Sequence, residues 1–291
     1  MATNPTFQLF PSSNDKSSQG SGLGLGFLDS PEPALPPPPP PIEVFSSEAS
    51  SIAVDKVTIG EITLLKGRVS TKEVFGLPNS DLVPGVYEGG LKLWEGSIDL
   101  VKALEKESLT GNLSFSGKRV LELGCGHALP GIYACLKGAD AIHFQDFNAE
   151  VLRCLTIPNL YANLSEKTSS VSVSETQVRF FAGEWSEVHQ ILPLVNDGET
   201  DKKSGYDIIL MAETIYSISA QKSLYELIKR CLVYPDGAVY MAAKKYYFGV
   251  GGGTRQFLSM IEKDGVLAST LVSEVTDGSS NVREVWKLLY K

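Results

Sequence analysis

Short apolar runs alternate along the chain with longer segments whose apolar residues recur at helical spacing. The runs typical of buried parallel strands are Val120–Leu123, Ala141–Asp146, Val178–Trp185, Gly205–Tyr216 and Ala238–Lys244. The segments between them predict helices that begin near Ser97 and after Pro130, and helices over Ala149–Leu164 and Ala220–Leu232. Strands that alternate with helices in this way predict a doubly wound α/β sheet.

Two features depart from this alternation. Pro158 falls inside the predicted helix Ala149–Leu164 and should kink or end it. After the last parallel strand, an aromatic cluster is followed by three glycines, Gly251–Gly253, which suit either a flexible connector or a substrate loop. A further helix is predicted over Thr254–Lys263, and an antiparallel hairpin over Val266–Val275 and Val282–Leu289 closes the sheet.

The N-terminal part of the chain has a different composition. Residues 1–51 are rich in Ser, Gly and Pro and include the run Pro36–Pro41, so they bury too little apolar surface to offset chain entropy. We expect a disordered tail, with the proline run as an extended rod that is either simply solvated or docks on an SH3- or WW-type domain. From Ile52 to Val69 apolar residues alternate, which predicts a small hairpin or a cap (52–96) on the main domain, 52–291.

Composition excludes few classes of protein but favours some. The 291 residues carry a net charge of −8, which argues against sequence-specific nucleic-acid binding and suits a basic protein substrate. The four cysteines and three histidines are too scattered to predict disulfides or a metal site. No apolar run has the length of a membrane helix, and no secretory signal is evident, so we expect a protein of the cytoplasm and nucleus.

The candidate chemistry centres on Gly124 and Gly126, directly after the predicted strand Val120–Leu123. Glycines there let the backbone turn sharply and approach a ligand closely. The third glycine of a dinucleotide fingerprint is missing from its position, which Leu129 occupies. Glu122 would repel a pyrophosphate but suits a cationic ligand. The E-x-G-x-G pattern resembles motif I of the seven-strand S-adenosylmethionine (SAM) methyltransferases.

Later strand ends add further candidate residues. Asp146, about 20 residues past the glycine turn, is placed to accept both ribose hydroxyls; alternatively it or Asn148 caps the next helix. Gly183, Glu184 and Trp185 stand at the end of the next predicted strand, where an acid and an indole can contact adenine, although Trp185 could instead only cover the sheet edge. His127 is expected to satisfy backbone groups near the cofactor rather than to touch substrate.

Five stretches together resemble the protein-histidine N-methyltransferases of the METTL-eighteen-like branch, from about Asp81 to the C-terminus. They are Tyr87–Glu95, Gly124–Gly131, Phe144–Asp146, Gly183–Ser186 and Tyr247–Gly253. Glu213-Thr-Ile-Tyr216 resembles the D/E-x-x-Y element of the wider group that methylates lysine or histidine in proteins. The resemblance implies a seven-strand Rossmann-like sheet and tele-methylation of one histidine in the large-subunit ribosomal protein uL3.

The resemblance also implies the site residues. Those that would contact SAM are Leu93, Trp94, Glu95, Gly96, Ser97, Glu122, Gly124, Gly126, Gln145, Asp146, Phe147, Gly183, Glu184, Trp185 and Ala212. Animal members carry serine at the position of Ala212, and there a backbone contact would survive but a hydroxyl contact would not. We expect Glu213 or Tyr216 to orient the substrate. Trp94 could equally be a core anchor.

Three functions remain open at this stage. The first is a protein-histidine methyltransferase, expected to be a monomer without a metal. The second is a lysine methyltransferase of the same fold, in which a group such as Glu213 must help to deprotonate an amine of pKa about 10.4. The third is a non-catalytic SAM-binding adaptor of ribosome assembly. A neutral imidazole is already nucleophilic at cellular pH, so the first needs only an acceptor for its other ring N–H.

Overall fold

The computed structural model of the chain describes residues 37–78, 80–167, 177–194, 204–276, 278 and 281–291. The first 36 residues of the predicted tail lie outside this part. No helix within the described ranges is long and apolar enough to cross a membrane. The four cysteines are free thiols; Cys125, Cys135 and Cys231 are buried and Cys154 is partly exposed.

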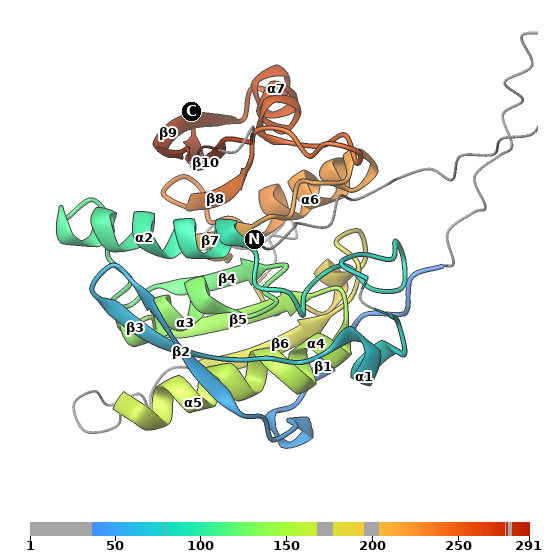
Figure 1. Cartoon of the computed structure of the whole chain (residues 1–291). Coiled ribbons are helices and arrows are strands. Elements are labelled where there is room, and N and C mark those ends of the chain that lie inside the picture. The colour runs from blue at the N-terminus through green and yellow to red at the C-terminus, as the bar shows by residue number, and fades with distance from the viewer. Residues whose placement is uncertain (1–36, 79, 168–176, 195–203, 277, 279–280) are drawn as a thin grey trace, which may run out of the picture. The chain divides into compact units, whose positions relative to one another are not determined.

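One eight-stranded sheet organises the fold, in the order β1-β6-β5-β4-β7-β8-β10-β9. Its parallel strands are β4 (Arg119–Leu123), β5 (Ala141–Asp146), β6 (Gln177–Ala182), β7 (Ile208–Ala212) and β8 (Ala238–Lys244). The chain winds outward from β4 to β5 and β6, then returns to the other side of β4 through β7 and β8 (Figure 1). The predicted doubly wound α/β fold is confirmed, and the reversal beside β4 is where such sheets bind ligands.

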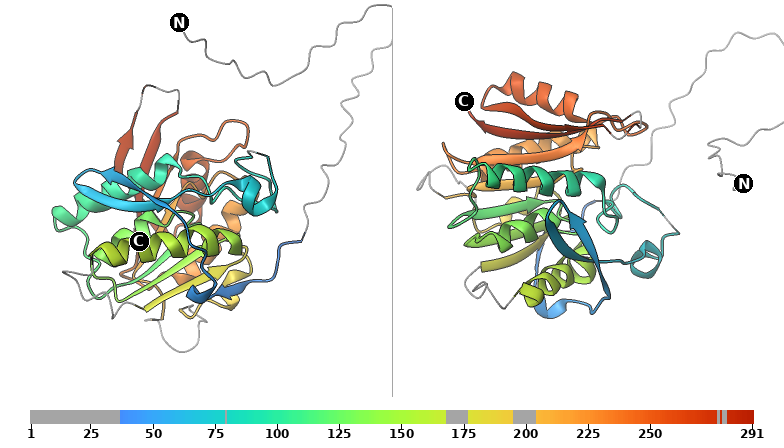
Figure 2. Two further views of the ribbon diagram at one scale, coloured as in Figure 1. Left: turned by 60° about the horizontal axis from the view of Figure 1, so that its bottom comes forward. Right: turned by 60° about the vertical axis from the view of Figure 1, so that its left-hand side comes forward.

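The two faces of the sheet are covered by different helices (Figure 2). Neighbouring residues of β4 point to opposite faces, so Val120 packs in one core cluster and Leu121 in the other. The Val120 cluster includes α2 (Glu95–Leu109), α3 (Leu129–Leu136) and α5 (Ile157–Lys167). The Leu121 cluster includes α6 (Ile218–Cys231) and α7 (Thr254–Asp264).

The C-terminal hairpin predicted from the sequence is present. β9 (Leu267–Val275) and β10 (Arg283–Tyr290) pair antiparallel, with a bulge between Val285 and Trp286. β10 also pairs antiparallel with β8, so the last strand of the chain lies between β8 and β9.

Pro158 does not end its helix. α4 (Ala149–Val151) runs into a π-helical turn over Leu152–Thr156, and α5 follows from Ile157. The π turn changes the hydrogen-bonding register directly before the proline, which then sits in the first turn of α5, where a missing N–H costs little.

The N-terminal hairpin consists of β2 (Val54–Ile59) and β3 (Ile62–Gly67), and a short helix α1 (Thr71–Phe75) follows it. Asn163 of α5 donates to the carbonyl of Leu65 at 2.7 Å and accepts its N–H at 2.8 Å. Asn159 accepts the N–H of Gly67 at 2.5 Å and donates to the carbonyl of His127 at 3.1 Å. The hairpin is thereby tied, through α5, to the glycine turn after β4.

The predicted boundary of the disordered tail at residue 51 is too late. β1 (Ile42–Val44) pairs antiparallel with β6 and covers what would otherwise be an open sheet edge. Val44 is buried in the core, and Glu43 forms a two-pronged ion pair with Arg179 at 2.7 Å. A strand of three residues can form here because the edge of β6 offers backbone groups for pairing. The low-complexity composition of this segment does not reveal that pairing.

Candidate active site

A cavity of about 510 Å³ opens at the carboxyl ends of β4, β5, β6 and β7. Its lining contains most residues predicted to hold the cofactor: Leu93, Trp94, Ser97, Glu122, Gly124, Gly126, Asp146, Phe147, Gly183, Glu184, Trp185 and Ala212. Glu213 and Tyr216 also line it. Glu95, Gly96 and Gln145 do not line it. Glu95 is exposed at the start of α2, whereas Gly96 and Gln145 are buried and form hydrogen bonds to residues of the cavity wall.

The glycine turn adopts the backbone that its sequence predicts. Gly124 and Gly126 have φ of +61° and +48°, a region that favours glycine. A Cβ on Gly126 would lie 2.8 Å from the carbonyl oxygen of Gly90, and one on Gly124 would lie 2.8 Å from the side chain of Thr214. Both glycines are therefore fixed by close packing as well as by their dihedral angles.

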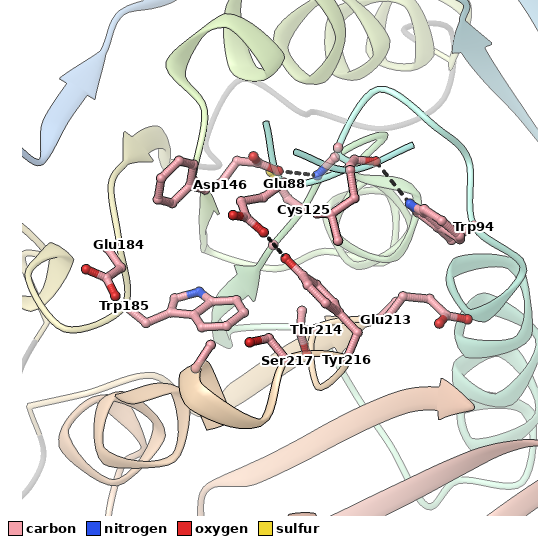
Figure 3. A pocket seen from close by; sticks show the side chains of 18 of the residues that line it. Glu88, Trp94, Cys125, Asp146, Glu184, Trp185, Glu213, Thr214, Tyr216 and Ser217 are labelled. Carbon is pink, nitrogen blue, oxygen red and sulfur yellow. Dashed lines mark hydrogen bonds between the residues drawn. The ribbon is translucent and has the colours of Figure 1, made fainter. Parts of the chain in front are cut away.

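Asp146 is bound to the glycine turn and still faces the cavity (Figure 3). Its Oδ2 accepts the N–H of Gly126 at 2.9 Å and its Oδ1 accepts the N–H of Asn148 at 3.1 Å. Burial raises the pKa of this carboxyl to about 6, in spite of the backbone N–H groups that lower it. Asn148 precedes α4 but makes no side-chain cap; its amide instead holds the backbone of Val86 and Glu88.

Gln145 joins three parts of the cofactor wall. Its fully buried side chain accepts the N–H of Gly124 at 3.2 Å and the indole N–H of Trp185 at 2.9 Å. It also donates to the carbonyl of Gly183 at 2.8 Å. Trp185 is therefore fixed in the cavity wall instead of merely covering the sheet edge.

Glu122 is buried beneath the turn. Its Oε2 accepts the N–H of Gly131 at 2.8 Å, which anchors the first turn of α3. Gly131 permits this approach, because a Cβ there would lie 2.4 Å from the same oxygen. Burial raises the pKa of Glu122 well above its ordinary value, so a cation brought close to it would favour its ionised form.

Glu213 is held by both of its carboxylate oxygens. Oε1 accepts the N–H of Gly96 at 3.1 Å, and Oε2 accepts the phenol of Tyr247 at 2.5 Å. The residue has φ of +58°, a strained conformation for glutamate that is typical of functional sites. Its pKa is raised by burial. Glu213 thus positions the start of α2 against the loop after β8, with no oxygen left without a partner.

A smaller cavity of about 100 Å³ adjoins the first and shares part of its lining. Both cavities are lined by Glu88, Glu213 and Tyr216, and the smaller cavity is also lined by Tyr247. The phenol of Tyr216 donates to Oε2 of Glu88, and Figure 3 shows this pair reaching into the site below Asp146. Sequence reasoning missed Glu88, although it stands in the stretch Tyr87–Glu95 that carries the family resemblance.

The glycine-rich loop after β8 is fixed to the segment that carries Tyr216. The N–H of Gly252 donates to the carbonyl of Tyr216 at 3.0 Å, and that of Gly253 to the carbonyl of Ile215 at 3.1 Å. A Cβ on Gly252 would lie 2.2 Å from the latter oxygen. Val250 lines both cavities. This arrangement favours the substrate-loop interpretation over a free connector.

Two further predicted residues have structural partners. The indole of Trp94 donates to the carbonyl of Gly89 at 3.0 Å, and Lys92 lies 4.3 Å above its ring. His127 lies 3.1 Å from the carbonyl of Leu91 through Nε2, and burial lowers its pKa to about 4. It is therefore a neutral side chain that joins the turn to the segment before α2, as expected.

The proline run contributes to the site, which the sequence did not indicate. Pro37 and Pro38 line the larger cavity, and Pro41 packs on Gly183 so closely that a Cβ there would lie 2.9 Å away. Pairing of β1 with β6 brings these prolines to the end of β6.

The residues present fit SAM. The glycine turn provides close backbone approach, Asp146 a carboxylate for a diol, and Trp185 a fixed aromatic surface. Glu122 and Asp146 are carboxyl groups, and the positive charges of a sulfonium and an ammonium group would favour their ionised forms. Among the described residues, no cluster of three or more His, Cys, Asp or Glu could hold a metal ion.

Comparison with known proteins places this site in a family. A family model described as lysine methyltransferase matches residues 85–264, which include the turn, the ends of β4 to β7 and the loop after β8. The chain belongs to this family.

Individual relatives of the chain are named for different target residues, either histidine or lysine. Histidine protein methyltransferase 1 homolog of Dictyostelium discoideum is 42% identical over 215 residues, 74% of this chain and 62% of that protein. The homolog of Bos taurus is 37% identical over 240 residues, 76% of this chain and 62% of that protein. EEF1A lysine methyltransferase 3 of Mus musculus is 25% identical over 156 residues, 53% of this chain and 55% of that protein. The chain thus spans less than two thirds of the length of these curated relatives.

Proposed function

We propose that the chain is a SAM-dependent protein-histidine N-methyltransferase that methylates the tele nitrogen. The observation that carries this proposal is the identity of 37–42% to proteins named histidine protein methyltransferase 1, against 25% to one named for lysine. The resemblance of the motifs supports a histidine of the large-subunit ribosomal protein uL3 as the substrate. The net charge of −8 suits a basic protein of that kind.

The chain's own residues divide the work of the reaction. SAM supplies a methyl group bound to a positively charged sulfur. Asp146 would hold the ribose hydroxyls, and the backbone at Gly124 and Gly126 would allow close approach. Trp185 would offer its indole to the adenine ring. Glu213 and Tyr247 fix the start of α2 against the loop after β8. The enzyme contributes mainly positioning, because the methyl transfer is an in-line displacement.

The geometry suits an imidazole acceptor better than an amine. A neutral imidazole needs no strong base, and Glu213, the carboxylate that sequence reasoning put forward for that task, has both oxygens occupied. Lysine is the second candidate, favoured by the description of the family model. Glu213 has a raised pKa and would then have to release Tyr247 to assist removal of the amine proton.

The test uses the purified chain, labelled SAM and a ribosomal extract from cells that lack the enzyme. The labelled band is hydrolysed and its amino acids are separated. We expect tele-methylhistidine in a band of the size of uL3. Methyl-lysine would move the protein to the second candidate. No label, with SAM still bound, would overturn catalysis and support a SAM-binding adaptor.

A further inference from the structure

Glu88 is a partly exposed carboxylate of the smaller cavity that retains hydrogen-bonding capacity. Its Oε1 accepts the N–H of Gly85 at 2.7 Å, and its Oε2 accepts the phenol of Tyr216. A carboxylate offers about four lone-pair positions, two on each oxygen, so acceptor capacity remains on both atoms. Glu88 lines both cavities, so it lies at the junction between the predicted cofactor site and the side cavity.

The other carboxylates of the side cavity are committed elsewhere. Glu213 binds Gly96 and Tyr247, as described above. Asp81 is exposed at the rim and forms an ion pair with Lys92 at 2.5 Å. Glu213 is buried, whereas Glu88 is partly exposed. Of the described acids that line this cavity, Glu88 is therefore the one that the protein orients through both oxygens and that a guest can reach.

Tyr216 fixes both the position and the protonation pattern of this carboxylate. Burial, together with the charge of Glu88, raises the pKa of the Tyr216 phenol far above its ordinary value. The phenol therefore remains protonated and donates, which leaves Glu88 as the acceptor. The ring of Tyr216 meets that of Tyr247 edge to face at 6.4 Å, and the two rings with Trp94 give the small cavity flat aromatic walls.

We propose that Glu88 is the positioning residue that accepts the Nδ1–H of the substrate imidazole and so directs Nε2 toward the methyl group. The proposal rests on the proposed function and names the group that selects the reacting nitrogen. A planar ring of imidazole size suits the aromatic cavity, and a ring bound through Nδ1–H presents the lone pair of Nε2 on its other side.

The groups already named account for every electron pair and for the proton in this methyl transfer. The Nε2 lone pair forms the new bond to the methyl carbon, and the bond from that carbon to sulfur breaks with its electron pair left on sulfur. Positive charge passes to the imidazole ring as this happens. Glu88 faces that developing charge across the Nδ1–H hydrogen bond and stabilises it. The Nδ1 proton then leaves through Glu88 to water, which yields the neutral methylated ring.

The experiment compares the wild-type chain with Glu88→Ala, Glu88→Gln and Tyr216→Phe. Each is assayed for SAM affinity, for kcat and for the ratio of tele- to pros-methylhistidine in hydrolysed product. We expect Glu88→Ala to lower kcat about 100-fold with SAM affinity within about threefold, as for a lost positioning contact. It should also yield pros-methylhistidine, because nothing then fixes the ring. Glu88→Gln keeps an acceptor oxygen and should retain selectivity with kcat about tenfold below wild type.

Asp264→Asn is a matched control. Asp264 also accepts a tyrosine phenol, that of Tyr225 at 2.8 Å, but at the far end of α7 and outside both cavities. It should change kcat less than about twofold. Tyr216→Phe should lie between Glu88→Ala and wild type in selectivity, because Glu88 loses one of its two partners but keeps its bond to Gly85.

Two other results of this experiment would contradict the role proposed for Glu88. Unchanged kcat and selectivity in Glu88→Ala would overturn it, and so would loss of SAM affinity in both Glu88 variants, which would assign the carboxylate to the cofactor or to the fold. These outcomes leave the proposed function standing if the wild type still makes tele-methylhistidine. If the wild type makes no methylhistidine, the proposed function itself fails.

Discussion

The two halves of the site are built in different ways. The proposed cofactor half (Gly124, Gly126, Gln145, Asp146 and Trp185) is joined by hydrogen bonds between residues 20 to 40 positions apart. The substrate half (Glu88, Glu213, Tyr216 and Tyr247) includes side-chain bonds across longer separations, such as the 128 positions between Glu88 and Tyr216. The first half follows from adjacent ends of parallel strands, whereas the second depends on how distant loops fold over that edge.

This difference predicts that the halves respond differently to mutation. Damage to the cofactor half should weaken SAM binding, and damage to the substrate half should lower turnover while SAM still binds.

The largest effect is expected from Asp146→Ala in the cofactor half. The variant loses the carboxylate for the ribose hydroxyls and also the acceptor that holds the N–H of Gly126. We expect the Kd for SAM to rise about 100-fold, measured by calorimetry, since hydrogen bonds to a charged group contribute about 1.5–3 kcal/mol each. Glu187→Gln, at a partly exposed acid that lies after β6 and outside both cavities, serves as the control. An unchanged Kd would remove Asp146 from the cofactor site.

Glu213→Ala should reveal the opposite behaviour in the substrate half. It frees both Gly96 and Tyr247, so the aromatic wall of the smaller cavity loses its support. We expect kcat to fall about 30-fold and the Kd for SAM to rise at most about threefold. Losses of equal size in kcat and in affinity would contradict the division into two halves.

The pH dependence of SAM binding sharpens the comparison further. The carboxyl of Asp146 has a pKa raised to about 6 by burial, so it is ionised above that pH and protonated below it. The ionised form accepts the ribose hydroxyls, and affinity should therefore fall as pH drops, to about one tenth at pH 5 of its value at pH 7. Calorimetric titrations at several pH values check this. Asp146→Asn should bind SAM weakly, with little dependence on pH. If this variant showed the pH dependence of the wild type, the titrating group would be one other than Asp146.

The smallest effect is expected from shortening the N-terminus. Removal of residues 1–41 deletes Pro37 and Pro38 from the cavity wall but keeps β1. We expect the Kd for SAM to rise about threefold, equivalent to about 0.6 kcal/mol of lost apolar contact. A chain that lacks only residues 1–34 retains these prolines and should bind as the full chain does. Equal affinity of both shortened chains would show that the prolines contribute nothing.

The sequence predicted the sheet and most of the residues that line the larger cavity, because both depend on local patterns. Apolar runs identified the parallel strands, with β5 and β8 at the observed bounds, and the glycine turn marked the end of β4. The strand β1 was missed because three residues carry no periodic signal. Its position depends on the open edge of β6, which exists only in the folded sheet.

The substrate half was predicted only in part. Glu213 and Tyr216 stood in a recognisable motif, but their partners come from separate segments. Nothing near Glu88 in the sequence indicates that it meets Tyr216. The structural role of Gln145 was also not predicted. Its position is typical of a residue that contacts the cofactor, but the same position suits a buried side chain that forms hydrogen bonds to the cavity wall.

The most direct test of the account is a crystal structure of the chain with S-adenosylhomocysteine, the demethylated product of SAM. We predict that both ribose hydroxyls lie within hydrogen-bonding distance of Asp146, that adenine contacts Trp185, and that the sulfur faces the cavity of Glu88 and Tyr216. A ribose bound away from Asp146, or a sulfur directed away from that cavity, would contradict the division of the site into a cofactor half and a substrate half.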